Sequence, residues 1–264
     1  MRTATTERPI KAPPTLLALA ELHRAVVEIA TLPIAASILR QAPRGDGHPV
    51  LVVPGFTASD VSTGILRRYL SRLGYDSYAW ELGRNLGPKA IGREGEKLIA
   101  RLNAIHDETG RTVSLVGWSL GGVMARQLSR RAPHAVRQVI SLGSPFTGDP
   151  RATSVWRIYE YVSGQKMSDK DTQRQLKESH RAPPVPSTAI YSKSDGIVAW
   201  QNCIEPASAT TDNIEVYGSH CGLGVNPAVL YAVADRLAQA EDGWAPFDRR
   251  GWKGAFYPSS GHLQ

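Results

Sequence analysis

Residues 113–125 read Val-Ser-Leu-Val-Gly-Trp-Ser-Leu-Gly-Gly-Val-Met-Ala. An apolar strand at 113–116 runs into the pattern G-x-S-x-G at 117–121, and a helical segment runs out of it. A sharp strand-to-helix turn crowds the backbone, so only small residues fit around its centre. Such a turn would hold the hydroxyl of Ser119 at the edge of a sheet, beside a helix N-terminus that favours negative charge. The alternative is a glycine–serine turn with no catalytic role.

Short apolar strands alternate with helical segments on both sides of this turn. We expect strands at 50–53, 75–80, 113–116, 139–142, 187–191 and 213–217, and helices at 60–73, 91–106, 119–131 and 227–239. Strands separated by helices imply right-handed crossovers and a mostly parallel sheet with helices on both faces. The predicted fold class is therefore α/β.

A length of 264 residues suits one principal hydrophobic core. A cluster of helix breakers at 43–49 separates an N-terminal helical segment, 1–45, from a main domain, 46–264. Within that domain, about 146–186 contains no convincing strand, and we expect a cap over the carboxyl end of the sheet. The tail at 241–264 is expected to pack along the surface without forming an element.

A catalytic serine needs a general base, and the base needs an acid that fixes its tautomer. Asp195 and His220 each follow a predicted strand, as Ser119 does. The carboxyl ends of parallel strands meet at one edge, where α/β sheets collect their active sites. We predict Ser119 as nucleophile, Asp195 as acid and His220 as base. Asp149 is the reserve acid, while an Asp-Gly turn and an ordinary loop histidine are the non-catalytic alternatives.

The developing oxyanion needs two backbone N–H donors. Leu120 supplies one because it follows the nucleophile in the turn. Phe56, in the loop after the first strand, is the candidate for the other, since Gly55 lets that chain bend. Thr57 could add a hydroxyl donor. A plain strand-to-helix loop is the alternative.

Aromatic side chains suggest an apolar substrate pocket. Trp118 adjoins the nucleophile, and the expected cap carries Trp156 and Tyr159, together with Ile158 and Tyr161. They favour an acyl or otherwise apolar substrate over a sugar or peptide. The same aromatics could instead pack the cap onto the core.

These motifs resemble the α/β-hydrolase superfamily, and within it the bacterial lipases and esterases. The resemblance spans about 48–239 and is carried by P-G-F at 54–56, G-W-S-L-G-G at 117–122, S-D-G-I-V at 194–198 and G-S-H at 218–220. It implies the same nucleophile, acid, base and oxyanion donors. The first two strands usual in such enzymes have no counterpart before Val50, which predicts a reduced sheet with an edge for the N-terminal helices to cover.

The sequence has two cysteines, Cys203 and Cys221. Some secreted lipases that this chain resembles tie the acid loop to the base loop with a disulfide, and the resemblance implies that pairing here. Two reduced thiols are the equal alternative, because cytosolic proteins seldom keep structural disulfides.

Composition excludes several classes of function. Lys and Arg (31) exceed Asp and Glu (24) by 7, but the basic residues are scattered without an aromatic-and-basic motif, so no nucleic-acid partner is expected. The motifs H-E-x-x-H, G-x-x-x-x-G-K and G-x-G-x-x-G are absent from the sequence. The prediction therefore includes no metal and no organic cofactor.

The N-terminal segment is apolar but interrupted. Charged or polar residues break every window at 15–39 that could span a bilayer or form a signal-peptide core: Glu21, His23, Arg24 and Glu28. Helical spacing of Leu16, Leu19, Leu22, Val26, Val27 and Ala30 predicts an amphipathic helix, broken near Pro33 and followed by a short helix at 34–39. We expect it to dock on the domain of a cytoplasmic protein, with peripheral membrane contact as the alternative.

The sequence as a whole predicts a serine hydrolase that cleaves small or lipid-like carboxylic esters through an acyl-enzyme on Ser119. Two alternatives remain. An acyltransferase could use the same three residues, and a binding protein could keep the fold with an inert site.

Overall fold

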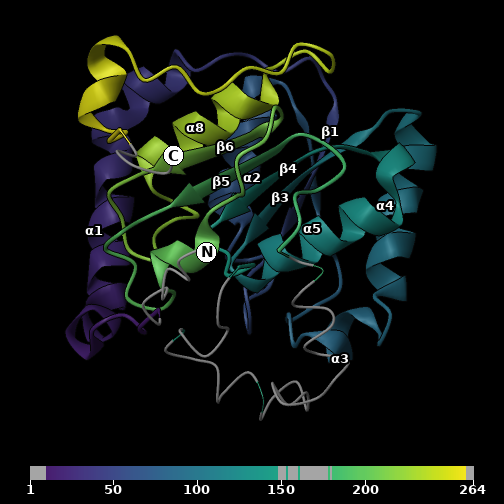
Figure 1. Cartoon of the computed structure of the whole chain (residues 1–264). Helices are drawn as coiled ribbons and strands as arrows, with labels where there is room; N and C mark the ends of the chain where they lie inside the picture. The colour runs from purple at the N-terminus through teal and green to yellow at the C-terminus, as the bar shows by residue number, and fades with distance from the viewer. Residues whose placement is uncertain (1–9, 148–152, 154–159, 161–177, 179, 260–264) are drawn as a thin grey trace, which may run out of the picture.

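The computed structural model describes residues 10–147, 153, 160, 178 and 180–259. These residues form one sheet of six strands in the order β2-β1-β3-β4-β5-β6, with every neighbouring pair parallel (Figure 1). The strands are β1 (Pro49–Val53), β2 (Asp76–Ala79), β3 (Val113–Trp118), β4 (Val136–Leu142), β5 (Ser187–Tyr191) and β6 (Thr211–Glu215). The α/β class and the reduced parallel sheet are confirmed.

Helices cover both faces of this sheet (Figure 1). They are α1 (Thr15–Arg40), α2 (Gly64–Leu73), α3 (Pro88–Ile91), α4 (Glu96–Thr109), α5 (Leu120–Arg131) and α8 (Pro227–Leu237). Short 3-10 helices occupy Pro133–Ala135, Trp200–Cys203 and Gly251–Ala255.

Two predicted helices differ from the observed ones. The helix expected at 60–73 begins only at Gly64, because the carboxylate of Asp60 instead accepts the backbone N–H groups of Trp80 and Glu81 after β2. The helix expected at 91–106 is observed as α4, Glu96–Thr109, whereas Ile91 is the last residue of the separate short helix α3. Gly92 and Gly95 separate the two with φ angles of 91° and 72°, which end a right-handed helix.

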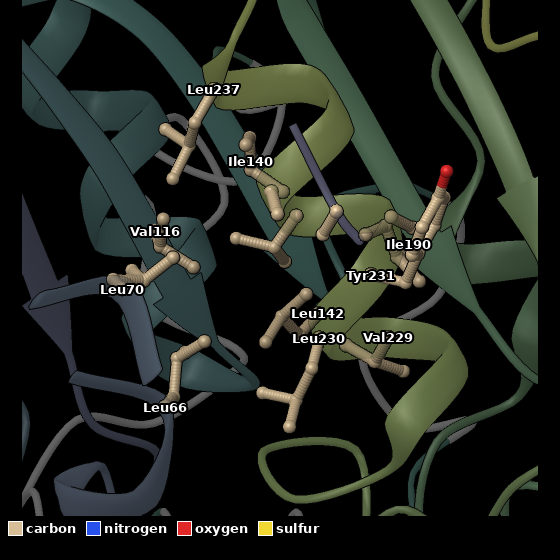
Figure 2. Packing of buried hydrophobic residues seen from close by; sticks show 14 of the residues in the cluster. Leu66, Leu70, Val116, Ile140, Leu142, Ile190, Val229, Leu230, Tyr231 and Leu237 are labelled. Carbon is tan, nitrogen blue, oxygen red and sulfur yellow. The ribbon is translucent and has the colours of Figure 1, made fainter. Parts of the chain in front are cut away.

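Strand β1 is buried on both faces and separates two apolar clusters. Val50 and Val52 face the cluster built on α2 and α8, whereas Leu51 and Val53 face the cluster built on α4 and α5. Figure 2 shows the first cluster, in which Leu66 and Leu70 of α2 and Val229 and Leu230 of α8 meet Val116, Ile140, Leu142 and Ile190 of the sheet. The uninterrupted apolar run of β1 is what two covered faces require.

Helix α1 runs unbroken through Pro33, so the predicted break there is wrong. A proline inside a helix removes one N–H and leaves the carbonyl four residues earlier without its partner. Pro33 and Ile29 both lie on the exposed side of α1, where water can bind that carbonyl. The loss of the hydrogen bond is therefore tolerated.

The orientation of α1 is also opposite to the prediction. Its apolar residues face solvent, with Leu19 75% exposed, while Glu21 is buried at 2% exposure. The exposed apolar side chains are Leu16, Leu19, Leu22, Val26, Val27, Ile29, Ile34 and Ile38. By length and composition α1 could cross a membrane, whereas the sequence analysis takes its charged and polar residues to rule this out. A signal sequence near the start of a chain meets the same criterion of length and composition.

The inner side of α1 packs chiefly on α8. Its side-chain hydrogen bonds go to the loops that follow β5 and β6, through Glu21, Arg24 and Glu28. The sequence predicts instead that the N-terminal helices cover a strand edge. In the structure α1 instead buries its polar residues against the loops that follow β5 and β6.

The tail contributes to the core beside α8. Phe247 and Tyr257 are buried in the first cluster, and the N–H of Phe247 donates to Asp212 at 2.7 Å. The 3-10 helix at Gly251–Ala255 corrects the expectation of a tail without an element. Of the expected cap, Thr153 forms an antiparallel bridge with Val198. Five residues singled out there lie outside the described residues: Asp149, Trp156, Ile158, Tyr159 and Tyr161.

Candidate active site

Ser119 occupies a strained turn between β3 and α5. Its φ of 54° and ψ of −121° lie outside the regions that residues with a side chain prefer. The flanking glycines allow the backbone to pack this closely: a Cβ on Gly117 would lie 2.4 Å from the nitrogen of Gly122, and one on Gly121 would lie 2.3 Å from the carbonyl oxygen of Val53. The turn thus requires the glycines of the G-x-S-x-G pattern.

Asp195 and His220 meet at the carboxyl ends of β5 and β6. The distance from His220 Nδ1 to Asp195 Oδ2 is 2.6 Å, and the two residues are 7% and 4% exposed. The second oxygen of Asp195 accepts the N–H groups of Ile197 and Val198, so the carboxylate is held on both sides. A proton on Nδ1 directed at Asp195 leaves Nε2 free to act as a base.

Backbone contacts bring the turn at Ser119 next to this pair. The N–H of Ser119 donates to the carbonyl of Leu142 at 2.8 Å. A Cβ on the following residue, Gly143, would lie 3.2 Å from both His220 Nδ1 and Asp195 Oδ2. Within the described chain the hydroxyl of Ser119 makes no hydrogen bond, and its residue is partly exposed. The structure therefore groups the three predicted residues at one edge of the sheet, with the serine open to approach.

The charge of Asp195 controls the protonation of His220. Burial alone would lower the pKa of His220, because desolvation disfavours the imidazolium. The negative charge of Asp195 and its hydrogen bond oppose burial, with a smaller contribution from Glu21, and the pKa is raised above its usual 6.5. The pairing with Asp195 thus stabilises the imidazolium form of His220 against the effect of burial.

The two predicted oxyanion donors belong to two segments that adjoin Ser119. Leu120 is the first residue of α5, where N–H groups have no partner within the helix. The loop after β1 approaches from the other side, since a Cβ on Gly55 would lie 3.4 Å from the Cβ of Ser119, and the next residue is Phe56. Thr57 has a φ of 61°, and its hydroxyl donates to the carbonyl of Phe56 at 2.7 Å.

Asn85 holds this loop, a role that the sequence does not predict. It is fully buried, its side-chain amide donates to the carbonyl of Pro54 at 2.8 Å, and its backbone carbonyl accepts the N–H of Thr57 at 2.8 Å. A single asparagine in the stretch after β2 carries no local signal of such a role. Only the proximity of β2 and β1 in the sheet brings it to the loop.

Trp118 contacts the base loop as well as flanking the nucleophile. Its indole N–H donates to the carbonyl of His220 at 3.1 Å, and its ring lies against Gly224. The residue therefore supports the position of His220, whereas the sequence suggests a role in substrate binding. The other aromatic residues expected in that pocket, Trp156 and Tyr159, lie outside the described part of the chain.

Both cysteines are free thiols, so the disulfide implied by the resemblance is not formed. Burial raises the pKa of Cys203, and it raises the pKa of Cys221 to about 12 with a contribution from Glu21. Each thiol is therefore neutral near pH 7.

A second Ser-His-Asp arrangement lies at the amino ends of β1 and β3. His48 Nδ1 is 2.5 Å from Asp46 Oδ1, and its Nε2 is 2.8 Å from the hydroxyl of Ser114. Ser114 and His48 are completely buried, and burial lowers the pKa of His48. No substrate can reach Ser114, so this arrangement is structural. Access, rather than residue types, distinguishes the two sites.

Among the described residues there is no group of three or more His, Cys, Asp or Glu side chains that could hold a metal ion.

Comparison with solved structures identifies the fold. No family model matches the sequence. The structure is similar to a monoacylglycerol lipase of Paleococcus ferrophilus, with a TM-score of 0.54 and 14% identity over 73% of this chain and 96% of that one. It is also similar to lipase B of Aspergillus fumigatus (TM-score 0.56, 20% identity, 78% of this chain and 58% of that one) and to a mature lipase of Bacillus licheniformis (0.51, 18%, 72% and 91%).

The fold is that of the α/β hydrolases. The expectation drawn from the G-x-S-x-G turn and its neighbouring strands is thereby confirmed at the level of the fold.

Proposed function

We propose that this protein is a serine hydrolase that cleaves carboxylic esters through an acyl-enzyme on Ser119. The observation that carries the proposal is the 2.6 Å hydrogen bond between His220 and Asp195, at the sheet edge where the strained turn presents Ser119. Structures with the same fold include lipases, which supports ester substrates as a class.

In the proposed reaction the hydroxyl of Ser119 attacks the ester carbonyl while His220 Nε2 takes its proton. Asp195 stabilises the imidazolium, and the N–H groups of Leu120 and Phe56 bind the oxyanion. His220 then returns the proton to the departing alcohol as the carbon–oxygen bond breaks. Water then attacks the acyl-enzyme while His220 takes its proton, and His220 passes that proton to Ser119 Oγ as the bond from the acyl carbon to Ser119 breaks and the acid leaves.

A fluorophosphonate probe tests the nucleophile. We expect the wild-type protein to be labelled and Ser119→Ala to remain unlabelled, because the probe phosphonylates an activated serine. The matched control is Ser114→Ala, which removes the hydroxyl of the buried second arrangement and should leave labelling intact. Labelling that persists in Ser119→Ala would reject the proposal. Product analysis with added alcohols then separates hydrolysis from acyl transfer.

We also propose a lipid-like ester as substrate and a cytoplasmic enzyme in peripheral contact with membranes. The exposed side of α1 supports this, because its apolar residues lie between the exposed cations Lys11 at one end and Arg40 and Arg44 at the other. Apolar burial combined with attraction to anionic lipid is how such helices bind an interface. Co-sedimentation with anionic vesicles, compared for wild type and Leu19→Glu, tests the contact. Equal binding of the two proteins would exclude it.

A further inference from the structure

The buried face of α1 places one carboxylate between the acid loop and the base loop. Glu21 Oε1 accepts the N–H of Gly196 at 2.8 Å, and Glu21 Oε2 accepts the N–H of Cys221 at 2.8 Å. Gly196 directly follows Asp195, and Cys221 directly follows His220. A single side chain therefore contacts the backbone beside each member of the hydrogen-bonded pair.

The approach of α1 to the acid loop depends on a glycine. A Cβ on Gly196 would lie 2.5 Å from the carbonyl carbon of Leu17, so a larger residue would push the helix away. Arg24, one turn after Glu21, donates to the carbonyl of Ser194 at 2.7 Å and to its hydroxyl at 2.9 Å, and it lies 3.6 Å from the carboxylate of Glu21. The acid loop is thus held by two residues of the helix.

Glu28 makes contacts of the same kind, but only to the base side. Its Oε1 accepts the N–H of Ser219 at 2.7 Å, and its Oε2 accepts the amide N–H of Asn226 at 2.9 Å. Residues 21, 24 and 28 have the i, i+3, i+7 spacing of one helix face. That face is polar and turned inward, which explains why the apolar face of α1 points outward.

We propose that Glu21 is a positioning residue that fixes the separation and orientation of Asp195 and His220. The inference rests on the function proposed above, because it assigns those two residues the roles of acid and base. Hydrogen bonds from backbone N–H groups to a carboxylate are short and strong. Here they join two loops 25 residues apart in sequence to one rigid helix, so neither loop can move without losing a bond.

Glu21 also acts on His220 through its charge. Two charged groups on neighbouring elements act on the imidazole: Asp195 on the acid loop and Glu21 on α1. Glu28 and Arg24 contact the adjacent residues of the two loops, since Glu28 accepts the N–H of Ser219 and Arg24 donates to the carbonyl of Ser194. The thiol of Cys221 is neutral near pH 7 because its pKa is raised to about 12. Since the charge of Glu21 helps to raise the pKa of His220, removing that charge should lower this pKa.

Glu21→Gln, with Glu28→Gln as matched control, tests the proposal. Hydrolysis of a soluble p-nitrophenyl ester is measured across pH. In Glu21→Gln one N–H loses its acceptor, so we expect kcat to fall about tenfold or more with KM changed less than threefold, because the pair is displaced. The acidic limb of the kcat/KM profile should move to lower pH. Glu28→Gln should lose less activity and keep that limb in place.

Glu21→Asp provides a second variant that keeps the charge. Its shorter side chain cannot reach both loops, so kcat should fall while the acidic limb stays where the wild type has it. The proposal is overturned if Glu21→Gln and Glu21→Asp keep kcat within about twofold of wild type, since a few tenths of an ångström of misplacement should cost more. If the fluorophosphonate probe does not label Ser119 in the wild-type protein, the proposed function itself is rejected.

Discussion

Replacing Gly143 with alanine should impair catalysis as well as folding. Gly143 has a φ of 54°, and a Cβ there would lie 2.6 Å from Leu223 Cδ1 and 3.2 Å from both Asp195 Oδ2 and His220 Nδ1. The end of the leucine side chain can move aside. The hydrogen-bonded pair must also shift by a few tenths of an ångström, because 3.2 Å is closer than carbon normally approaches nitrogen or oxygen.

The expected magnitude follows from these contacts. Left-handed backbone costs an alanine about 1–2 kcal/mol, and crowding in a packed site adds about 1–3 kcal/mol. A displacement of about 1 Å can lower a rate about a hundredfold, so a shift of a few tenths should lower kcat about tenfold. That loss corresponds to about 1.4 kcal/mol in the activation barrier.

Gly110→Ala is the matched control. Gly110 has a φ of 64° at the end of α4, and a Cβ there would have no neighbour within 4 Å among the described residues, so this variant should show the backbone cost alone. Urea unfolding and ester hydrolysis are measured for both variants. If kcat of Gly143→Ala stays within about twofold of Gly110→Ala, the inferred contact between Gly143 and the pair has no catalytic consequence, and the reasoning fails.

Three further predictions concern the base, the oxyanion loop and the core. Because the pKa of His220 is raised above 6.5 by Asp195, kcat/KM should fall as pH decreases through a midpoint above 6.5; a pH–rate profile with a lower midpoint would contradict this. Asn85→Ala should lower kcat about tenfold or more, with a smaller change in KM, by releasing the loop after β1; steady-state kinetics with unchanged kcat would argue against that support. Glu205→Ala removes the carboxylate from the buried guanidinium of Arg126 and should cost about 3–5 kcal/mol in urea unfolding, and a loss below about 1 kcal/mol would show that the pair is replaceable.

Much of the fold can be predicted because its signals are local. The run at 113–125 combines a strand, a glycine-crowded turn and a helix within one short segment, and its steric demands can be read from residue types alone. Asp195 and His220 can be predicted by the same reasoning, since each follows a strand of a parallel sheet.

The features that the sequence does not predict depend on contacts between distant residues. The inward face of α1 cannot be identified from hydrophobic spacing, because a buried Glu21 is explained by its hydrogen bonds to the N–H groups of Gly196 and Cys221. These residues lie 175 and 200 positions away in the sequence. Asn85 similarly acquires its role from the adjacency of two strands. His48 shows the converse problem: it forms a Ser-His-Asp arrangement, yet its burial makes it structural.

The polar attachment of α1 makes residues 15–40 part of the sheet edge that carries the candidate site. A chain shortened to begin at Pro49 would keep all six strands, the whole second apolar cluster and most of the first, which would lose Leu39 and Ala42. It would nevertheless leave the N–H groups of Gly196, Ser219 and Cys221 without their carboxylate acceptors. Such a shortened protein could fold and still hold Asp195 and His220 loosely, so a soluble product would be no guarantee of an intact site.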